Sequence, residues 1–269
     1  MNPPIDSHVD GSEEFFSALR KSQINFDLAY TWGNILRYSI VGEQVVQLLT
    51  RSSSRIRILD IGCSQATLYG FLTANFSIDP SSIDYTGIEV DEESMHAIRR
   101  NYGDEVTIKT FDLASSDKFS DLLNGKFDLV VITQVVEHIG IKQTQSVLAQ
   151  ISEILSDDGL LILSSPNPKK HKGERFISEE SHHHHVYEFA ESEMKALLQS
   201  SGFEIVSKFG AFTRFNQIKP LFPNLEHSEK PHQDLGRHLH PIGASFATAL
   251  VGTIFSNYAK NYLFIAKKS

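Results

Sequence analysis

Seven short runs rich in β-branched and aromatic residues constrain the fold more than any other feature of this sequence. The first five are RIRILDI, YTGIEV, TIKTFDL, FDLVVIT and LLILSSP, and segments predicted to be helices or loops separate them. Two later runs, FEIVSKFG and NYLFIAKK, have the same character. Strands that alternate with helices favour a parallel sheet. The sequence therefore predicts an α/β fold built on one central sheet.

The segments outside these runs predict how the domain is organised. Residues 1–11 hold two prolines and a glycine without any period, and apolar residues recur at helical spacing from Glu13 to about Thr50. We expect residues 1–54 to form an arm and N-terminal helices, and residues 55–269 to form the main domain. Residues 210–260 separate the last two runs by far more than a hairpin loop, so they predict a lid insertion.

Composition and charge narrow the classes of function. The net charge of -8 on 269 residues argues against binding of duplex nucleic acid through the overall field and favours a small-molecule ligand. The single cysteine, Cys63, excludes an internal disulfide, and the chain shows neither a secretion signal nor an apolar run of membrane-spanning length. These features predict a cytoplasmic protein that does not associate with membranes.

The stretch RILDIGCSQAT has the layout of a strand, a turn and the start of a helix, which is where doubly wound sheets bind ligands. Gly62 permits a sharp turn and a close approach of the backbone to a ligand. Ser64 and Ala66 stand where further glycines are usual, and both are small. The full G-x-G-x-x-G pattern is absent, so a pyrophosphate is not the expected ligand.

Two acidic residues follow the next two predicted strands. Glu89 in GIEVDEE could accept both ribose hydroxyls of a nucleoside, and Asp112 in TFDLASS could accept from an adenine amino group. Either residue alone is more typical of a helix cap or a turn. In this order after Gly62, the two together indicate a nucleoside site.

The series ILDIGCSQATL, YTGIEVDEESM, FDLASS, FDLVVITQVVEHI and LSDDGLLILSSPN resembles the class I S-adenosylmethionine-dependent methyltransferases. The resemblance runs from about Arg55 through Ser165, and the two late strands extend it to the C-terminus. It implies a Rossmann-like, mostly parallel sheet of seven strands with an antiparallel last strand, and S-adenosyl-L-methionine as the cofactor. The cofactor-binding residues that it implies are Asp60, Gly62, Cys63, Ser64, Glu89, Asp112, Leu113, Thr133 and Gln134.

The candidates for catalysis are Glu137 and His138, which follow the fourth strand, and His185, which precedes an E-F pair. A hydroxyl acceptor needs its proton removed, and histidine can serve as that base. A purely structural interpretation is that Glu137 and His138 only fix the turn and line the cofactor pocket. A third interpretation makes Glu137, His138 and His185 ligands of a divalent metal ion.

The metal interpretation rests on a similarity to the small-RNA 3′-terminal 2′-O-methyltransferases, which carry an E-x-x-E-H segment. Gln134 replaces the first glutamate of that segment, and a neutral amide is a poorer cation ligand. We therefore favour the role without metal, with His138 and His185 facing one another across the acceptor site. The insertion adds His227, His232, His238 and His240 as further candidates near the acceptor.

The function that these features predict is O-methylation of a small hydroxylated molecule such as a sugar, a phenol or a secondary metabolite. The alternative is metal-dependent methylation of an RNA 3′-terminal ribose, for which PKKHKGER is the only evident basic stretch. A catalytically silent protein that binds the cofactor or a partner with the same fold is an alternative of another class.

Overall fold

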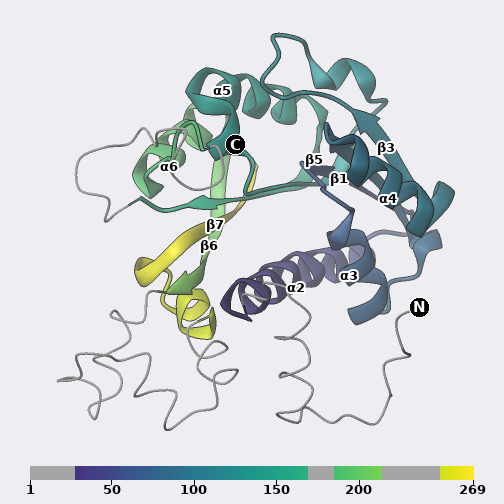
Figure 1. Cartoon of the computed structure of the whole chain (residues 1–269), viewed down its shortest axis with the longest axis horizontal. Helices are drawn as coiled ribbons and strands as arrows, with labels where there is room; N and C mark the ends of the chain where they lie inside the picture. Colours follow the sequence, from purple (N-terminus) through teal and green to yellow (C-terminus); the bar gives the residue numbers. More distant parts are fainter. Residues whose placement is uncertain (1–27, 169–184, 214–248) are drawn as a thin grey trace, which may run out of the picture.

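The computed structural model describes residues 28–168, 185–213 and 249–269. Seven strands form one sheet in the order β3-β2-β1-β4-β5-β7-β6 (Figure 1). The strands are β1 (Ile56–Ile61), β2 (Ile83–Glu89), β3 (Val106–Thr110), β4 (Phe127–Thr133), β5 (Leu155–Pro166), β6 (Phe203–Thr213) and β7 (Ala259–Lys268). The longer helices are α2 (Leu28–Arg51), α3 (Thr67–Asn75), α4 (Glu92–Tyr102), α5 (Val136–Ile154) and α6 (Glu191–Ser200).

The sheet is parallel except for β7, which pairs antiparallel with both β5 and β6. This arrangement confirms the predicted α/β, Rossmann-like sheet of seven strands with an antiparallel last strand. The strand order reverses direction at β1 and β4, because β2 and β3 lie on one side of β1 and the later strands lie on the other. Such a switch point is where open α/β sheets bind ligands, outside the carboxyl ends of the strands.

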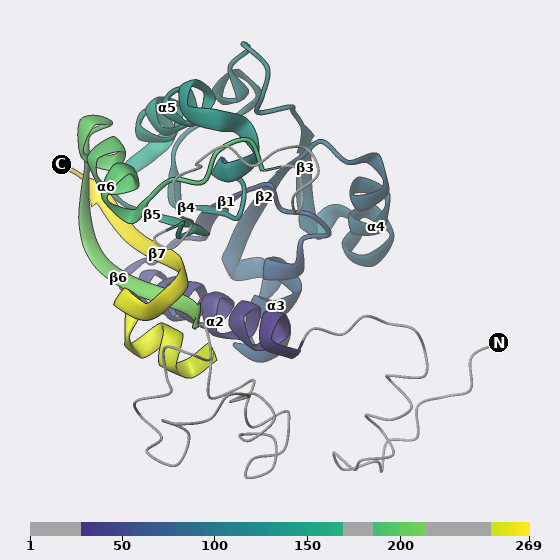
Figure 2. The same ribbon diagram turned by 60° about the vertical axis from the view of Figure 1, so that its left-hand side comes forward.

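Helices cover both faces of the sheet, and each face has its own apolar core. Helices α2, α3 and α4 supply one core, with residues such as Val41, Leu72 and Ile98. Helices α5 and α6 supply the other, with residues such as Leu148 and Leu198. Figure 2 shows α2 and α3 lying together on one side of the sheet, with α5 and α6 on the opposite side.

Helix α2 is the described part of the predicted helical preface. Its buried residues Ile40, Val41 and Val45 pack in the same core as strand residues Ile58 and Val131. The helix is therefore built onto the sheet of the main domain. Among the described helices, none combines the length and the apolar composition that crossing a bilayer requires.

β6 runs parallel to β1, and β7 runs antiparallel to both. The end of β6 and the start of β7 therefore lie at the carboxyl edge of the sheet, so the expected lid begins and ends there. The two strands take up residues 210–213 and 259–260 at the ends of the expected range. Residues 249–254 are helical and 214–248 lie outside the described residues. The lid, like the boundary between residues 54 and 55, stays a prediction.

Candidate functional site

The loop after β1 turns sharply because three of its residues adopt the left-handed conformation. Gly62 has φ of 70°, Ser64 has 49° and Ala66 has 54°. Glycines are usual at residues 64 and 66, and this conformation favours glycine. Ser64 and Ala66 adopt it although neither is a glycine. The Gly62 and Cys63 N–H groups donate to the Ile88 carbonyl, at 2.9 and 3.1 Å, which ties the loop to β2.

Asp60, near the end of β1, and Cys63, which follows Gly62, are both buried. Asp60 accepts a hydrogen bond from the Tyr85 hydroxyl, and burial raises the pKa of the Asp60 carboxyl to about 6. Burial also raises the pKa of the Cys63 thiol, whose sulfur lies 3.8 Å from the Ser64 carbonyl oxygen. The thiol is therefore unsuited to act as a nucleophile near neutral pH.

Glu89, at the end of β2, fixes the loop after β1 to the loop after β2. One carboxylate oxygen accepts from the Ser64 N–H at 2.7 Å. The other accepts from the N–H groups of Val90 and Asp91, at 2.8 and 3.0 Å. A carboxylate has about four lone-pair positions, so Glu89 retains about one with which to accept from a ribose hydroxyl.

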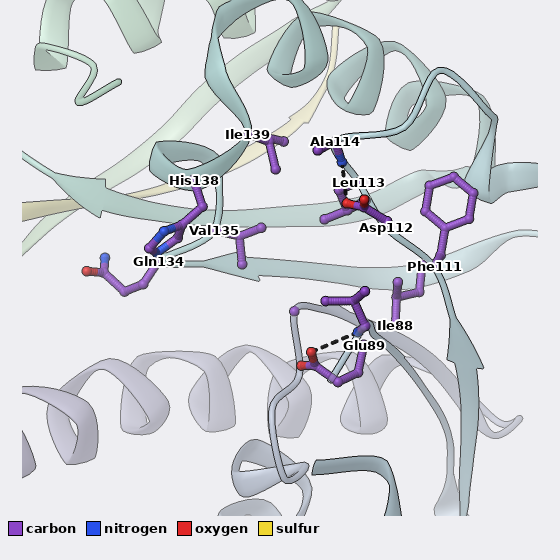
Figure 3. A pocket seen from close by; sticks show the side chains of 12 residues that line it. Ile88, Glu89, Phe111, Asp112, Leu113, Ala114, Gln134, Val135, His138 and Ile139 are labelled. Carbon is purple, nitrogen blue, oxygen red and sulfur yellow. Dashed lines mark hydrogen bonds between the residues drawn. The ribbon is translucent and has the colours of Figure 1, made fainter. Parts of the chain in front are cut away.

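Asp112 lies two residues beyond β3, where its carboxylate accepts from the Ala114 N–H at 2.8 Å. Its side chain is exposed at the mouth of a cavity of about 330 Å³. Of the predicted site residues, this cavity is lined by Gly62, Glu89, Asp112, Leu113, Gln134 and His138. Figure 3 shows Glu89 and Asp112 on neighbouring loops around it. Its volume is in the range of small-molecule sites.

The described residues that line the cavity include no lysine and no arginine. Its polar side chains are the carboxylates of Glu89 and Asp112, the Gln134 amide and the His138 imidazole. The cavity therefore presents acceptors to the hydroxyls and amino group of a nucleoside. Any anionic group of a ligand must find its cation beyond this lining.

Gln134 begins the turn after β4 with φ of 58°, next to Thr133 at the end of the strand. Its Nε2 donates to the Ser164 hydroxyl at 3.2 Å, and its Oε1 accepts from the Asn261 amide at 3.1 Å. The side-chain amide therefore holds β4, β5 and β7 together. Figure 3 shows it pointing away from Glu89 and Asp112.

Glu137 is buried at the start of α5, with 1% of its surface exposed. Its Oε2 accepts from the Ser165 hydroxyl at 3.2 Å, and burial raises the pKa of its carboxyl to about 7. The Glu137 carbonyl oxygen accepts from the N–H groups of Val186 and Tyr187, at 2.7 and 3.1 Å. These two bonds bring the segment after the HHHH tract against the first turn of α5.

The same contact brings His185 to His138. The ring centroids lie 4.8 Å apart with the planes at 77°. His185 Nδ1 lies 2.8 Å from Oε1 of Glu188, a residue that is 8% exposed. A carboxylate only accepts hydrogen bonds, so Nδ1 carries the proton of the neutral ring and Nε2 keeps its lone pair.

The predicted metal ligands also lie together. One donor atom from each of Glu137, His138 and His185 can be chosen so that all three lie within 4.8 Å of one another. Glu188 would then hold the outer nitrogen of a ligating histidine, as such carboxylates commonly do. The geometry thus allows His185 to act either as a base or as a cation ligand. The chemical nature of the neighbouring donor groups must distinguish these two roles.

Sequence reasoning overlooked three polar residues at this edge of the sheet. Glu188 belongs to the E-F pair that marked His185, and its spacing of three from His185 was an available signal. Asn167 directly follows β5, and neither atom of its side-chain amide, though buried, has a hydrogen-bond partner. Strand alternation places Asn167 on the face of Ser165 and Glu137. Arg37 on α2 is 4% exposed, and its Nε has no partner.

The remaining histidine candidates, His227, His232, His238 and His240, lie outside the described residues, as do the first three histidines of the HHHH tract. Most of the basic stretch PKKHKGER lies there as well.

A family model described as "Methyltransferase domain" matches residues 35–208, more than half of the chain. A sphingolipid C9-methyltransferase of Candida albicans is 25% identical over 181 residues, covering 62% of this chain and 33% of that protein. A ubiquinone biosynthesis O-methyltransferase of Rickettsia akari is 24% identical over 137 residues, covering 51% of each. The chain thus spans between a third and about half of the length of these relatives.

Among solved structures, magnesium protoporphyrin IX methyltransferase from Synechocystis PCC 6803, with S-adenosylhomocysteine bound, is similar over 96% of this chain and 95% of that one. The TM-score is 0.55 and the sequence identity is 16%. At this identity the likeness shows a shared fold.

Proposed function

The chain belongs to the methyltransferase-domain family, and from this membership we propose that it transfers the methyl group of S-adenosylmethionine to a hydroxyl of a small molecule. The observation that carries the choice of a hydroxyl is the pair formed by His185 and Glu188 beside His138. The cofactor, when bound, supplies an activated methyl group on a sulfonium. The protein must then align the acceptor and remove its proton.

The cavity residues fit the nucleoside half of this cofactor. Glu89 retains an acceptor position for a ribose hydroxyl, and the exposed Asp112 carboxylate can accept from an adenine amino group. Gly62 supports a close backbone approach, since its φ of 70° turns the chain at the wall of the cavity. The fit rests on the donor and acceptor types of these side chains.

The imidazole of His185 can take the acceptor's proton. As the methyl group passes to the acceptor oxygen, Nε2 of His185 would take up the hydroxyl proton, which would balance the loss of the sulfonium charge. Glu188 supports this step by holding the proton on Nδ1 and by stabilising the imidazolium that forms. Asn167 would pair with a further hydroxyl, because an amide both donates and accepts.

The second candidate is a cation held by Glu137, His138 and His185, as in metal-dependent methylation of a terminal ribose. The cluster of donor atoms favours it. Gln134 weighs against it, because both ends of its side-chain amide are already bound to Ser164 and Asn261. The net charge of -8 also weighs against an RNA substrate.

The test has three stages with the purified full chain. Calorimetry with S-adenosylhomocysteine should show binding. Release of S-adenosylhomocysteine from S-adenosylmethionine should then be measured with sugars, phenols and catechols as acceptors. Turnover that survives a chelator supports the base, whereas loss in chelator and recovery with a divalent ion supports the cation. Binding without turnover on any acceptor would favour the catalytically silent protein.

Glu188→Gln separates the base from a structural role. The amide can no longer stabilise the imidazolium, so kcat should fall by roughly 10- to 100-fold, the loss expected for a hydrogen bond to a charged group. The KM for S-adenosylmethionine should stay unchanged, because Glu188 does not line the cavity. Glu92→Gln, at an exposed residue of α4, is the matched control. An unchanged kcat in Glu188→Gln would contradict the assignment.

A further inference from the structure

The side-chain amide of Asn167 is closed off from water and has no partner. Asn167 directly follows β5, and neither its Nδ2 nor its Oδ1 makes a hydrogen bond to any residue that the structure describes. Buried polar groups nearly always have a partner, and one without a partner destabilises the fold. A donor and an acceptor left unpaired on one side chain therefore point to a ligand that supplies both.

The backbone around Asn167 is firmly held. Its N–H donates to the Lys260 carbonyl at 2.6 Å, which continues the pairing of β5 with β7. Pro166 and Pro168 flank it, and a proline fixes its own φ and restricts the residue before it to extended conformations. The residue itself is half-buried, so rotation about its side-chain bonds can bring the amide to a ligand. Little further ordering of the backbone is then needed for binding, which favours affinity.

Asn167 lies on the same face of the sheet as the segment that carries the proposed base. Strand alternation places it about 7 Å beyond Ser165 on that face. The Ser165 hydroxyl donates to the Glu137 carboxylate, and the Glu137 carbonyl oxygen accepts from the N–H of Val186. Val186 directly follows His185. Asn167 and His185 therefore border the same part of the carboxyl edge, where sheets of this kind bind their ligands.

We propose that Asn167 binds two adjacent hydroxyls of the acceptor, so that the enzyme selects a 1,2-diol, as in a sugar ring, over a molecule with a single hydroxyl. This inference rests on the proposed function and names the class of its acceptor. The reacting hydroxyl accepts from Nδ2 while its own proton faces His185, and the neighbouring hydroxyl donates to Oδ1. A single hydroxyl leaves Oδ1 unpaired, and a site built in this way rejects the analogue that lacks the second group.

The test uses acceptors that differ in the number and spacing of their hydroxyls. Catechol and cis-1,2-cyclohexanediol carry an adjacent pair, phenol and cyclohexanol carry one hydroxyl, and resorcinol carries two that are not adjacent. Release of S-adenosylhomocysteine by the purified full chain gives the KM for each acceptor. The KM of each adjacent pair should be roughly 5- to 150-fold lower than that of its single-hydroxyl counterpart, as expected when a buried polar atom is otherwise left unpaired. Resorcinol should resemble phenol.

Two variants assign this preference to the amide. Asn167→Ala should bring the KM values of catechol and phenol within about threefold of each other. The KM for S-adenosylmethionine should not change, because Asn167 does not line the cofactor cavity. Asn167→Leu keeps most of the volume without the polar atoms. It should abolish the same preference without lowering stability in urea unfolding, because the amide has no partner among the described residues.

The matched control is Asn101→Ala, at an exposed residue of α4, which should change neither the preference nor the stability. Equal KM values for paired and single hydroxyls in the wild type would overturn the inference, and so would equal values for catechol and resorcinol. A preference that survives in both Asn167 variants would show that other residues hold the diol. A loss of stability in Asn167→Leu would show that the amide is structural.

Failure of this inference is distinguishable from failure of the proposed function. Methylation of all five acceptors without any preference leaves the proposed function intact and overturns only the role of Asn167. If the chain binds S-adenosylhomocysteine but methylates none of the five, the proposed function fails first and this inference fails with it.

Discussion

Replacing Gly62 by alanine tests the geometry of the loop that follows β1. Gly62 has φ of 70°, and a Cβ added there would lie well inside van der Waals contact with Cγ2 of Val135. An L-residue in the left-handed conformation costs about 1–2 kcal/mol, and overpacking a filled space costs about 1–3 kcal/mol. We expect Gly62→Ala to lower the free energy of unfolding by about 2–5 kcal/mol, measured by urea unfolding followed by circular dichroism.

A matched glycine and a double mutant separate the two contributions. Gly202 has φ of 81°, and an added Cβ would meet only Ser152 Oγ at 3.9 Å, so Gly202→Ala should show the backbone cost alone. Adding Val135→Ala to Gly62→Ala should return about 1–3 kcal/mol beyond the sum of the single effects. Strict additivity would refute the steric reasoning. A cost of Gly62→Ala below about 0.5 kcal/mol would refute the loop conformation as well.

Two further substitutions test the electrostatics and the strain of the site. In the folded chain the pKa of Glu137 is raised to about 7, so the stability it contributes is full below about pH 4.5 and is lost as the pH rises through 7. Glu137→Gln should remove that pH dependence, up to about 3 kcal/mol, from unfolding curves taken between pH 4.5 and 7.5; an unchanged slope would contradict it. Ser64→Gly relieves a φ of 49° at an exposed position and should change stability by no more than about 1 kcal/mol in the stabilising direction. A loss above about 1 kcal/mol would show that the hydroxyl matters.

The sheet was predictable because its strands are buried runs of β-branched and aromatic residues whose character does not depend on distant partners. All seven predicted runs form strands, and the class I methyltransferase family is confirmed. The strand ends were less predictable. TIKTFDL suggested a strand reaching Leu113, but β3 ends at Thr110, which leaves Asp112 in a turn closed by the Ala114 N–H. Hydrogen bonds from a side chain to the nearby backbone compete with the hydrogen bonds between strands. The sequence pattern does not reveal which of the two will form.

The sequence could not single out Arg37 and Asn167. What distinguishes them is that buried polar atoms of their side chains have no hydrogen-bond partner in the described part of the chain. Arg37 stands in RYSIV, where a single charge on an amphipathic helix is usually solvated. Only the packing of α2 against β1 and β6 shows that the side chain is buried. Whether a polar atom is satisfied depends on residues from several elements, and that information exists only after folding.

The choice between a base and a cation at His185 follows from what surrounds each donor. A second carboxylate would stand at residue 134 in the E-x-x-E-H pattern, but Gln134 is neutral and both ends of its amide bind other strands. Glu137 is buried enough that its pKa is about 7, so a proton competes with any ion for its carboxylate near neutral pH. His185 keeps its proton on Nδ1 against Glu188, which leaves Nε2 ready to accept a proton without any further partner. The surroundings therefore make Gln134 and Glu137 poor cation ligands, whereas Glu188 equips His185 to act as a base. For this reason we propose proton removal by His185 as the chemistry of the site.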